Sequence, residues 1–252
     1  MIRYLLILVW AVAAIAALPP IPRLDGRIIG GHPVSIKDYS YQISLQYRRG
    51  GHFCGGSILS RKVILTSAHC ASEGPPSNFK ILYGTEHLYS GGAKINVSEI
   101  FAHPDYSSKS NDFDVSLVYL NDFIQFGDSA QPIKRTRTPQ DESNLRSATI
   151  SGWGAISING GSPPLLYAAE VKEYTNKACN DIYGSITDQM ICFASPGADS
   201  CTGDSGGPLV DIVTKEQVGI ISWGISCAHP SFPGVYSNIY TLNAWIEEHS
   251  RK

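Results

Sequence analysis

The stretch DSCTGDSGGPL, from Asp199 to Leu209, places one serine among glycines and near two aspartates. Glycine at this density indicates a tight turn, because glycine adopts positive φ without steric cost and lets another backbone approach closely. Such a turn could present Ser205 Oγ to a substrate. A serine hydroxyl needs an adjacent base before it attacks a carbonyl at neutral pH, so the base must come from elsewhere in the chain.

Two apolar runs upstream carry a histidine and an aspartate at their ends. His69 closes ILTSAHC directly before Cys70, where a disulfide would hold the turn rigid. Asp112 and Asp114 both stand in NDFDVSLVYL, and Asp114 heads the apolar run, which predicts a partly buried carboxylate there. His69 is therefore a candidate for the base that Ser205 needs.

A second interpretation of the same serine stays open at this point. The residues from Gly203 to Gly207 also satisfy G-x-S-x-G, the nucleophile elbow of α/β-hydrolases, whose acid and histidine follow the serine in the chain. Asp211 with His229 or His249 could fill those roles. The elbow requires a helix directly after the serine, but Pro208 stands there, and the chain lacks an alternating βα pattern.

The cysteines and the chain's start indicate a secreted protein. The chain has six cysteines and none has the C-x₂₋₄-C spacing of a zinc site, so we expect three disulfides, no metal and no cofactor. An apolar run from Tyr4 to Leu18 follows Arg3 and precedes two prolines. It is shorter than the roughly 20 residues that span a bilayer. Residues 1–16 are therefore predicted to be a signal peptide, with an uncleaved signal anchor as the alternative.

Short apolar stretches separated by turn residues must position these side chains. They predict an antiparallel all-β protein, because many short strands with period-2 alternation are typical of sandwiches and barrels. Helices are expected at 176–183 and at 241–252, and the polar stretch Lys134 to Ser147 is the expected linker. The predicted strands are 41–47, 62–67, 79–84, 94–101, 115–120, 147–153, 168–174, 217–223 and 234–239.

Eight motifs in order resemble the trypsins of the chymotrypsin-like serine protease family. The resemblance covers residues 28–252 and implies two six-stranded antiparallel β-barrels with a C-terminal helix. The motifs are RIIGG (27–31), HFCGGSIL (52–59), LTSAHC (65–70), DVSL (114–117), SGWG (151–154), DSCTGDSGGPL (199–209), SWG (222–224) and PGVY (233–236).

The resemblance implies a role for each residue of the site. Ser205 is the implied nucleophile, His69 the base, Asp114 its orienting carboxylate, and the N–H groups of Gly203 and Ser205 the oxyanion hole. Asp199 would form the floor of a pocket for Arg or Lys, left open by Gly224 and Gly234. Ser222 would bond to Asp114, and Trp223 with Gly224 would pair with the substrate backbone.

The resemblance also implies how the chain matures. Residues 17–27 would be an activation propeptide, cut after Arg27 so that the new Ile28 ammonium pairs with Asp204, and 28–252 the protease domain. The family pairing joins Cys54 to Cys70, Cys179 to Cys192 and Cys201 to Cys227. Three bridges resemble those of invertebrate digestive trypsins.

Partners follow from the resemblance and from charge. A formal charge of -2 argues against nucleic acid and membrane partners, and Lys134, Arg135 and Arg137 are expected to be isolated exposed charges. We expect a secreted, extracellular monomer that cuts protein and peptide substrates after Arg or Lys and binds protein protease inhibitors. The alternatives are a regulatory or venom protease with a narrow protein substrate, and a catalytically silent homologue that acts as a binding protein. Thr202 and Ser226 depart from the family pattern at the pocket rim, and His52 is expected at a turn or rim.

Overall fold

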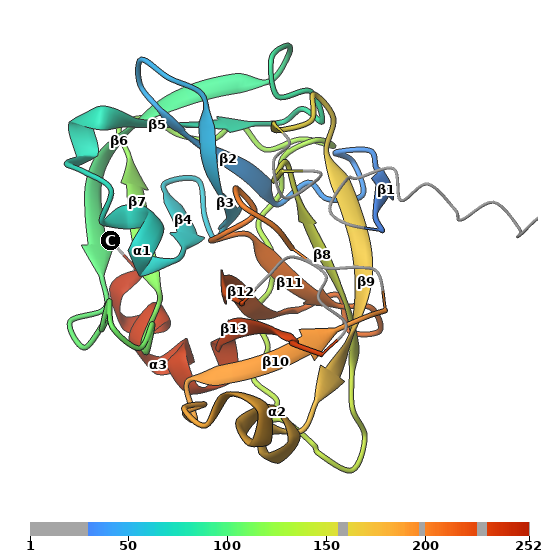
Figure 1. Cartoon of the computed structure of the whole chain (residues 1–252). Coiled ribbons are helices and arrows are strands. Elements are labelled where there is room, and N and C mark those ends of the chain that lie inside the picture. Colours follow the sequence, from blue (N-terminus) through green and yellow to red (C-terminus); the bar gives the residue numbers. More distant parts are fainter. Residues whose placement is uncertain (1–29, 156–160, 197–199, 226–230, 252) are drawn as a thin grey trace, which may run out of the picture.

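The computed structural model describes residues 30–155, 161–196, 200–225 and 231–251. Two closed six-stranded antiparallel β-barrels lie side by side, the first in blue and green and the second in yellow to red (Figure 1). The all-β, two-barrel prediction is confirmed. Within the described ranges, no helix is long and apolar enough to cross a membrane.

Barrel 1 has the strand order β2-β3-β4-β7-β6-β5 and closes through the pairing of β5 with β2. In β2, Ile43 and Leu45 belong to the apolar core, and the polar residues that alternate with them, Gln42, Ser44 and Gln46, are buried as well. Period-2 alternation therefore separates an apolar face from a polar one that is also buried. The strands are β2 (Gln42–Tyr47), β3 (His52–Ile58), β4 (Val63–Thr66), β5 (Phe79–Tyr83), β6 (Ala93–Ala102) and β7 (Ser116–Leu120).

Barrel 2 has the order β8-β9-β10-β13-β12-β11, closed by the pairing of β11 with β8, and β1 (His32–Pro33) adds to the edge of β9. Its core is built around Phe193 and Tyr236, whose rings meet edge to face. The strands are β8 (Ser147–Gly152), β9 (Tyr167–Tyr174), β10 (Met190–Ala194), β11 (Pro208–Asp211), β12 (Gln217–Trp223) and β13 (Gly234–Asn238).

Helical segments are few and short. The expected helices are present as α2 (Asn176–Tyr183) and α3 (Ile239–His249), each with a side-chain N-cap, from Thr175 and Asn238. The helix α3 begins two residues before the predicted start, at its cap. Two further segments, α1 (Ala68–Ala71) and the 3₁₀ turn η1 (Pro76–Asn78), were not expected.

The barrels share a buried interface. One apolar cluster combines Val63 and Leu65 of β4 with Ile220 of β12 and with Leu242 of α3, so the helix seals both barrels. Two buried hydrogen bonds cross between the barrels, from Ser57 Oγ to Gln217 Oε1 and from Ser151 Oγ to Gln42 Oε1, each 2.7 Å long. The interface is thus part of the core.

Candidate active site

A cavity of about 510 Å³ opens where the two barrels meet. Barrel 1 contributes α1 with His69, and barrel 2 contributes the loop before β11 with Ser205 and the end of β12. Among the sequence-predicted site residues, those that line the cavity are His69, Gly203, Ser205, Ser222, Trp223, Gly224 and Gly234. Arg27, Ile28 and Asp199 lie outside the described residues.

His69 and Asp114 are joined by two hydrogen bonds. His69 Nδ1 donates to Asp114 Oδ2 over 2.7 Å, and the backbone N–H of His69 donates to Oδ1 over 2.8 Å. Ser222 Oγ donates to the same Oδ2 over 2.5 Å, and Asp114 is fully buried. Because its oxygens accept these three bonds, the carboxylate stays in place and holds the imidazole in the tautomer with a proton on Nδ1.

The backbone before Asp114 has an unusual conformation. Phe113 has φ of 52°, in the left-handed region that residues other than glycine rarely adopt. Its ring stacks on His103 at 4.6 Å between centroids, and its N–H donates to Asp112 Oδ1. The turn directs Asp114 inward, whereas Asp112 accepts a hydrogen bond from Thr187 and does not line the cavity.

Ser205 lies on a turn whose next residue, Gly206, must be glycine. Gly206 has φ of 78°, and a Cβ there would lie 2.1 Å from Thr66 Oγ1 and 2.8 Å from Gly55 O. The two barrels meet at this point, because Gly55 N donates to Ser205 O across 2.8 Å. Ser205 Oγ and His69 line the same cavity, but no hydrogen bond joins them among the described residues. In free enzymes such bonds are often long and tighten with substrate.

Two backbone N–H groups at this turn are available to bind an anion. In the described part of the chain, the N–H groups of Asp204, Gly206 and Gly207 donate to carbonyls, while those of Gly203 and Ser205 have no acceptor. Gly203 has φ of 99°. Free N–H groups beside a nucleophile are the arrangement that stabilises a developing oxyanion.

His52 holds this turn in place, a role that sequence reasoning missed. It lies within β3 and is mostly buried, so the expected position at a turn or rim is wrong. Its Nε2 donates to Gly203 O and its Nδ1 accepts from Ser44 Oγ, both at 2.9 Å. Burial lowers the pKa of His52 to about 4, so the ring is neutral at pH 7.

Asp204 lies beneath the turn and is fully buried. Its carboxylate accepts hydrogen bonds from Gly154 N at 2.8 Å and Cys201 N at 3.0 Å. A Cβ at Gly152 or Gly154 would lie within 2.3 Å of that carboxylate, so both positions require glycine. The SGWG motif thereby makes room for a buried negative charge.

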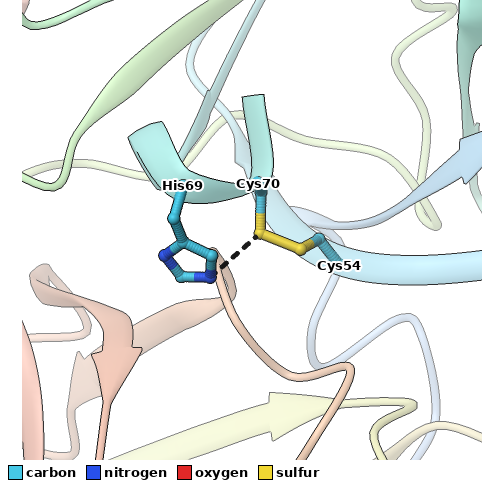
Figure 2. A group of neighbouring side chains, drawn as sticks. All are labelled: Cys54, His69 and Cys70. Atoms are coloured by element: carbon cyan, nitrogen blue, oxygen red, sulfur yellow. Dashed lines mark hydrogen bonds between the residues drawn. A yellow bond between two sulfur atoms is a disulfide. The ribbon is translucent and has the colours of Figure 1, made fainter. Parts of the chain in front are cut away.

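A disulfide lies beside His69. Cys54 pairs with Cys70, and His69 Nε2 lies 3.5 Å from Cys70 Sγ (Figure 2). A disulfide sulfur has no hydrogen to donate, so the Nε2 lone pair remains available to accept a proton. Both sulfurs are held in the S–S bond and offer no thiolate to a metal. Cys179 pairs with Cys192, Cys201 is also disulfide-bonded, and Cys227 lies outside the described residues.

Part of the cavity wall is formed by glycines. A Cβ at Gly224 would meet only Gly234 Cα, at 3.9 Å. Trp223 packs edge to face on Tyr183, which fixes the wall beside these glycines. No side chain projects from Gly224 and Gly234 into the cavity, and Thr202 lines it as well.

The α/β-hydrolase interpretation is wrong. Within each barrel, every pairing of strands is antiparallel. Asp211 caps a turn through Val213 N and Thr214 N, and the ring of His249 packs at a tilt against that of Trp245. Neither residue lines the cavity of Ser205, and His229 lies outside the described residues.

Comparison with known proteins gives the family. The family model described as Trypsin matches residues 28–246. The chain is 38% identical to trypsin 5G1 of Aedes aegypti over 90% of this chain and 86% of the relative. It is 34% identical to a vitellin-degrading protease of Bombyx mori, over 92% and 89%, and 36% identical to hypodermin-B of Hypoderma lineatum, over 100% and 99%. The chain belongs to the trypsin family and is a trypsin-like serine endopeptidase.

Proposed function

We propose that this endopeptidase is secreted as a zymogen, is activated by a cut after Arg27, and hydrolyses protein and peptide bonds after Arg or Lys. The hydrogen bond from His69 to the buried Asp114, in the cavity that Ser205 also lines, is the observation that carries the catalytic part. The specificity and the activation rest on the sequence motifs and on the relatives named trypsin.

In the first half of the proposed reaction, His69 Nε2 takes the proton of Ser205 Oγ as that oxygen attacks the scissile carbonyl carbon. The carbonyl oxygen becomes an oxyanion and accepts hydrogen bonds from the N–H groups of Gly203 and Ser205. Asp114 stabilises the imidazolium that forms. The imidazolium then gives its proton to the leaving amine, the C–N bond breaks, and an ester on Ser205 remains.

The second half repeats these steps with water as the nucleophile. His69 removes a proton from water as its oxygen attacks the ester carbon, and the same two N–H groups hold the second oxyanion. The proton returns to Ser205 Oγ when the ester bond breaks. The carboxylic acid product leaves and the site is restored.

Asp199 decides the proposed specificity. The activated protein should cleave peptides after Arg and Lys much faster than matched peptides with Phe or Leu before the cut. In Asp199→Ser, kcat/KM for the Arg peptide should fall by several powers of ten, because a desolvated guanidinium would lose its carboxylate partner. The Phe peptide should change far less. The matched control is Asp128→Ser, which removes an exposed carboxylate that pairs with Lys37 at the surface.

Equal losses for the Arg and Phe peptides in Asp199→Ser would show that this residue acts through folding, and the Arg/Lys assignment would fail. An activated protein that prefers Phe would refute it directly.

Activation is tested at Arg27. The protein Arg27→Gln should stay inactive, because a free Ile28 ammonium could not form to pair with the buried Asp204 carboxylate. Loss of one partner of a buried ion pair costs about 3–5 kcal/mol, enough to favour the inactive form. Full activity of uncut Arg27→Gln, checked by intact mass, would refute the zymogen proposal.

A further inference from the structure

A second polar cavity, of about 380 Å³, shares no lining residue with the active-site cavity. The turn between β3 and β4 forms one wall, and Asn243 and Ser250 at α3 form another. Residues between 133 and 138, within the connection from barrel 1 to barrel 2, form the third wall. We call it the basic pocket, after Lys134, Arg135 and Arg137.

The basic pocket has an excess of positive charge. Its three cations face a single acidic lining residue, Glu216. Arg137 forms an exposed ion pair with Glu247 at 3.0 Å. Within the described ranges, the side chains of Lys134 and Arg135 form no hydrogen bond and no ion pair.

The Arg135 backbone is fixed on both sides. Gln217 N donates to Lys134 O at 2.8 Å, and Thr136 N donates to Gln217 O at 2.9 Å. These bonds join the segment to the first residue of β12 as a short parallel bridge. The guanidinium therefore extends from an ordered backbone, which reduces the entropy that a ligand would have to remove.

The guanidinium of Arg135 is also partly desolvated. Its Nη1 is buried and has no partner among the described residues, and burial lowers the pKa of the group. Arginine nevertheless stays protonated in proteins. Glu247, which pairs with Arg137 and Arg251, is near enough to attract the guanidinium but accepts no hydrogen bond from it in the described part of the chain. A half-buried cation without a hydrogen-bonded carboxylate is unfavourable, and an oxyanion that accepts from its remaining N–H groups would relieve that cost.

We propose that the basic pocket binds an oxyanion, a phosphate, sulfate or carboxylate group, with Arg135 as the central donor and Lys134 and Arg137 beside it. The cavity falls in the size range of small-molecule sites, about 300–1,000 Å³, so it admits the group that carries the anion as well. The planar guanidinium fork matches two oxygens of one such group.

The test measures thermal unfolding of the full chain against rising inorganic phosphate, sulfate and acetate, with sodium chloride at matched ionic strength as the reference. All proteins carry Ser205→Ala to prevent self-digestion. The melting temperature should rise and saturate with at least one oxyanion but not with chloride. Tighter binding of acetate would identify a carboxylate, and tighter binding of phosphate or sulfate would identify those groups.

The variant Arg135→Gln should raise the half-saturating oxyanion concentration at least tenfold. The control Arg48→Gln, which removes an exposed arginine of the β2–β3 hairpin, should leave that concentration unchanged. If Arg135→Gln does not fold, the exposed pair Lys134→Gln with Arg137→Gln takes its place with the same expectation. No saturation with any oxyanion, or equal midpoints in Arg135→Gln and its parent, would overturn the proposal.

Discussion

At the scale of single residues, His52 joins two strands of barrel 1 to the turn that carries Ser205. Its ring accepts from Ser44 Oγ and donates to Gly203 O. Protonation would turn Nδ1 into a donor, so the Ser44 O–H would lose the acceptor for its own proton. The neutral ring therefore fits this network, and the charged ring does not.

This network makes stability depend on pH. The unfolded chain binds a proton at His52 below about pH 6.5, whereas the folded chain binds it only below about pH 4. The free energy of unfolding should therefore fall by up to about 3 kcal/mol as the pH drops from about 6.5 to about 4, and this contribution should not change further below that range. Urea unfolding at several pH values measures it, in proteins that carry Ser205→Ala.

The comparison uses His52→Gln and, as the control, His32→Gln, which changes an exposed histidine of β1. The slope between pH 6.5 and 4 should become shallower only in His52→Gln. A slope that stays the same in His52→Gln would mean that other groups cause the acid sensitivity.

At the scale of elements, the four residues of α1 carry His69, the proposed base, and the other three are buried. The disulfide from Cys70 to Cys54 of β3 ties this turn to the barrel. The second described bridge, Cys179–Cys192, ties α2 to β10 at a distance in sequence of 13 residues, against 16 for the first. The two bridges close loops of similar length, but only one borders His69.

Replacing each pair with serines separates stability from activity. Both double variants should lose about 3 kcal/mol of unfolding free energy, since the closed loops are alike. The change at Cys54 and Cys70 should also lower kcat/KM by about 100-fold in the folded fraction, because a small displacement of His69 disturbs proton transfer. The change at Cys179 and Cys192 should lower it much less. Equal kcat/KM in the two folded variants would show that the bridge does not position the base.

Most strands could be predicted from apolar alternation, but β1, β3, β10 and β11 were missed. The clearest case is β3. Its sequence HFCGGSI contains two glycines, which are typical of loops. A Cβ at Gly55 would lie 2.9 Å from Gly207 Cα, and one at Gly56 would lie 2.9 Å from Ile43 Cδ1. The glycines are needed for contact with the other barrel and for core packing, and neither requirement is visible in a local pattern.

The candidate site shows the same division. The family motifs identified His69, Asp114 and Ser205, because those residue types stand within recognisable stretches of sequence. They did not identify Phe113, whose left-handed backbone directs Asp114 inward, or His52, whose partner Gly203 is 151 positions away. Contacts of that kind depend on the packing of two barrels.

At the scale of the whole molecule, the interface between the barrels is buried and partly polar. Ser57 Oγ donates to Gln217 Oε1 in a region without water access. The variant Ser57→Ala should cost about 1–3 kcal/mol, because it leaves a buried acceptor without a donor. The control Ser108→Ala, at an exposed loop position, should change the unfolding free energy by less than about 0.5 kcal/mol.

Both variants should still unfold in one transition, since the apolar cluster of β4, β7, β12 and α3 belongs to both barrels. Coincident urea curves from tryptophan fluorescence and far-ultraviolet circular dichroism measure this. Separate curves would show that the barrels unfold independently and that the interface is weaker than its burial indicates.

The division of the site between the barrels has a consequence during synthesis. The ribosome releases barrel 1 first, and that half carries His69 and Asp114 but not Ser205, the proposed nucleophile. Ser205 follows in barrel 2, with free N–H groups that exist only once its turn has formed against Gly55. A nascent or truncated chain that has folded only barrel 1 therefore cannot cleave other proteins in the cell that makes it.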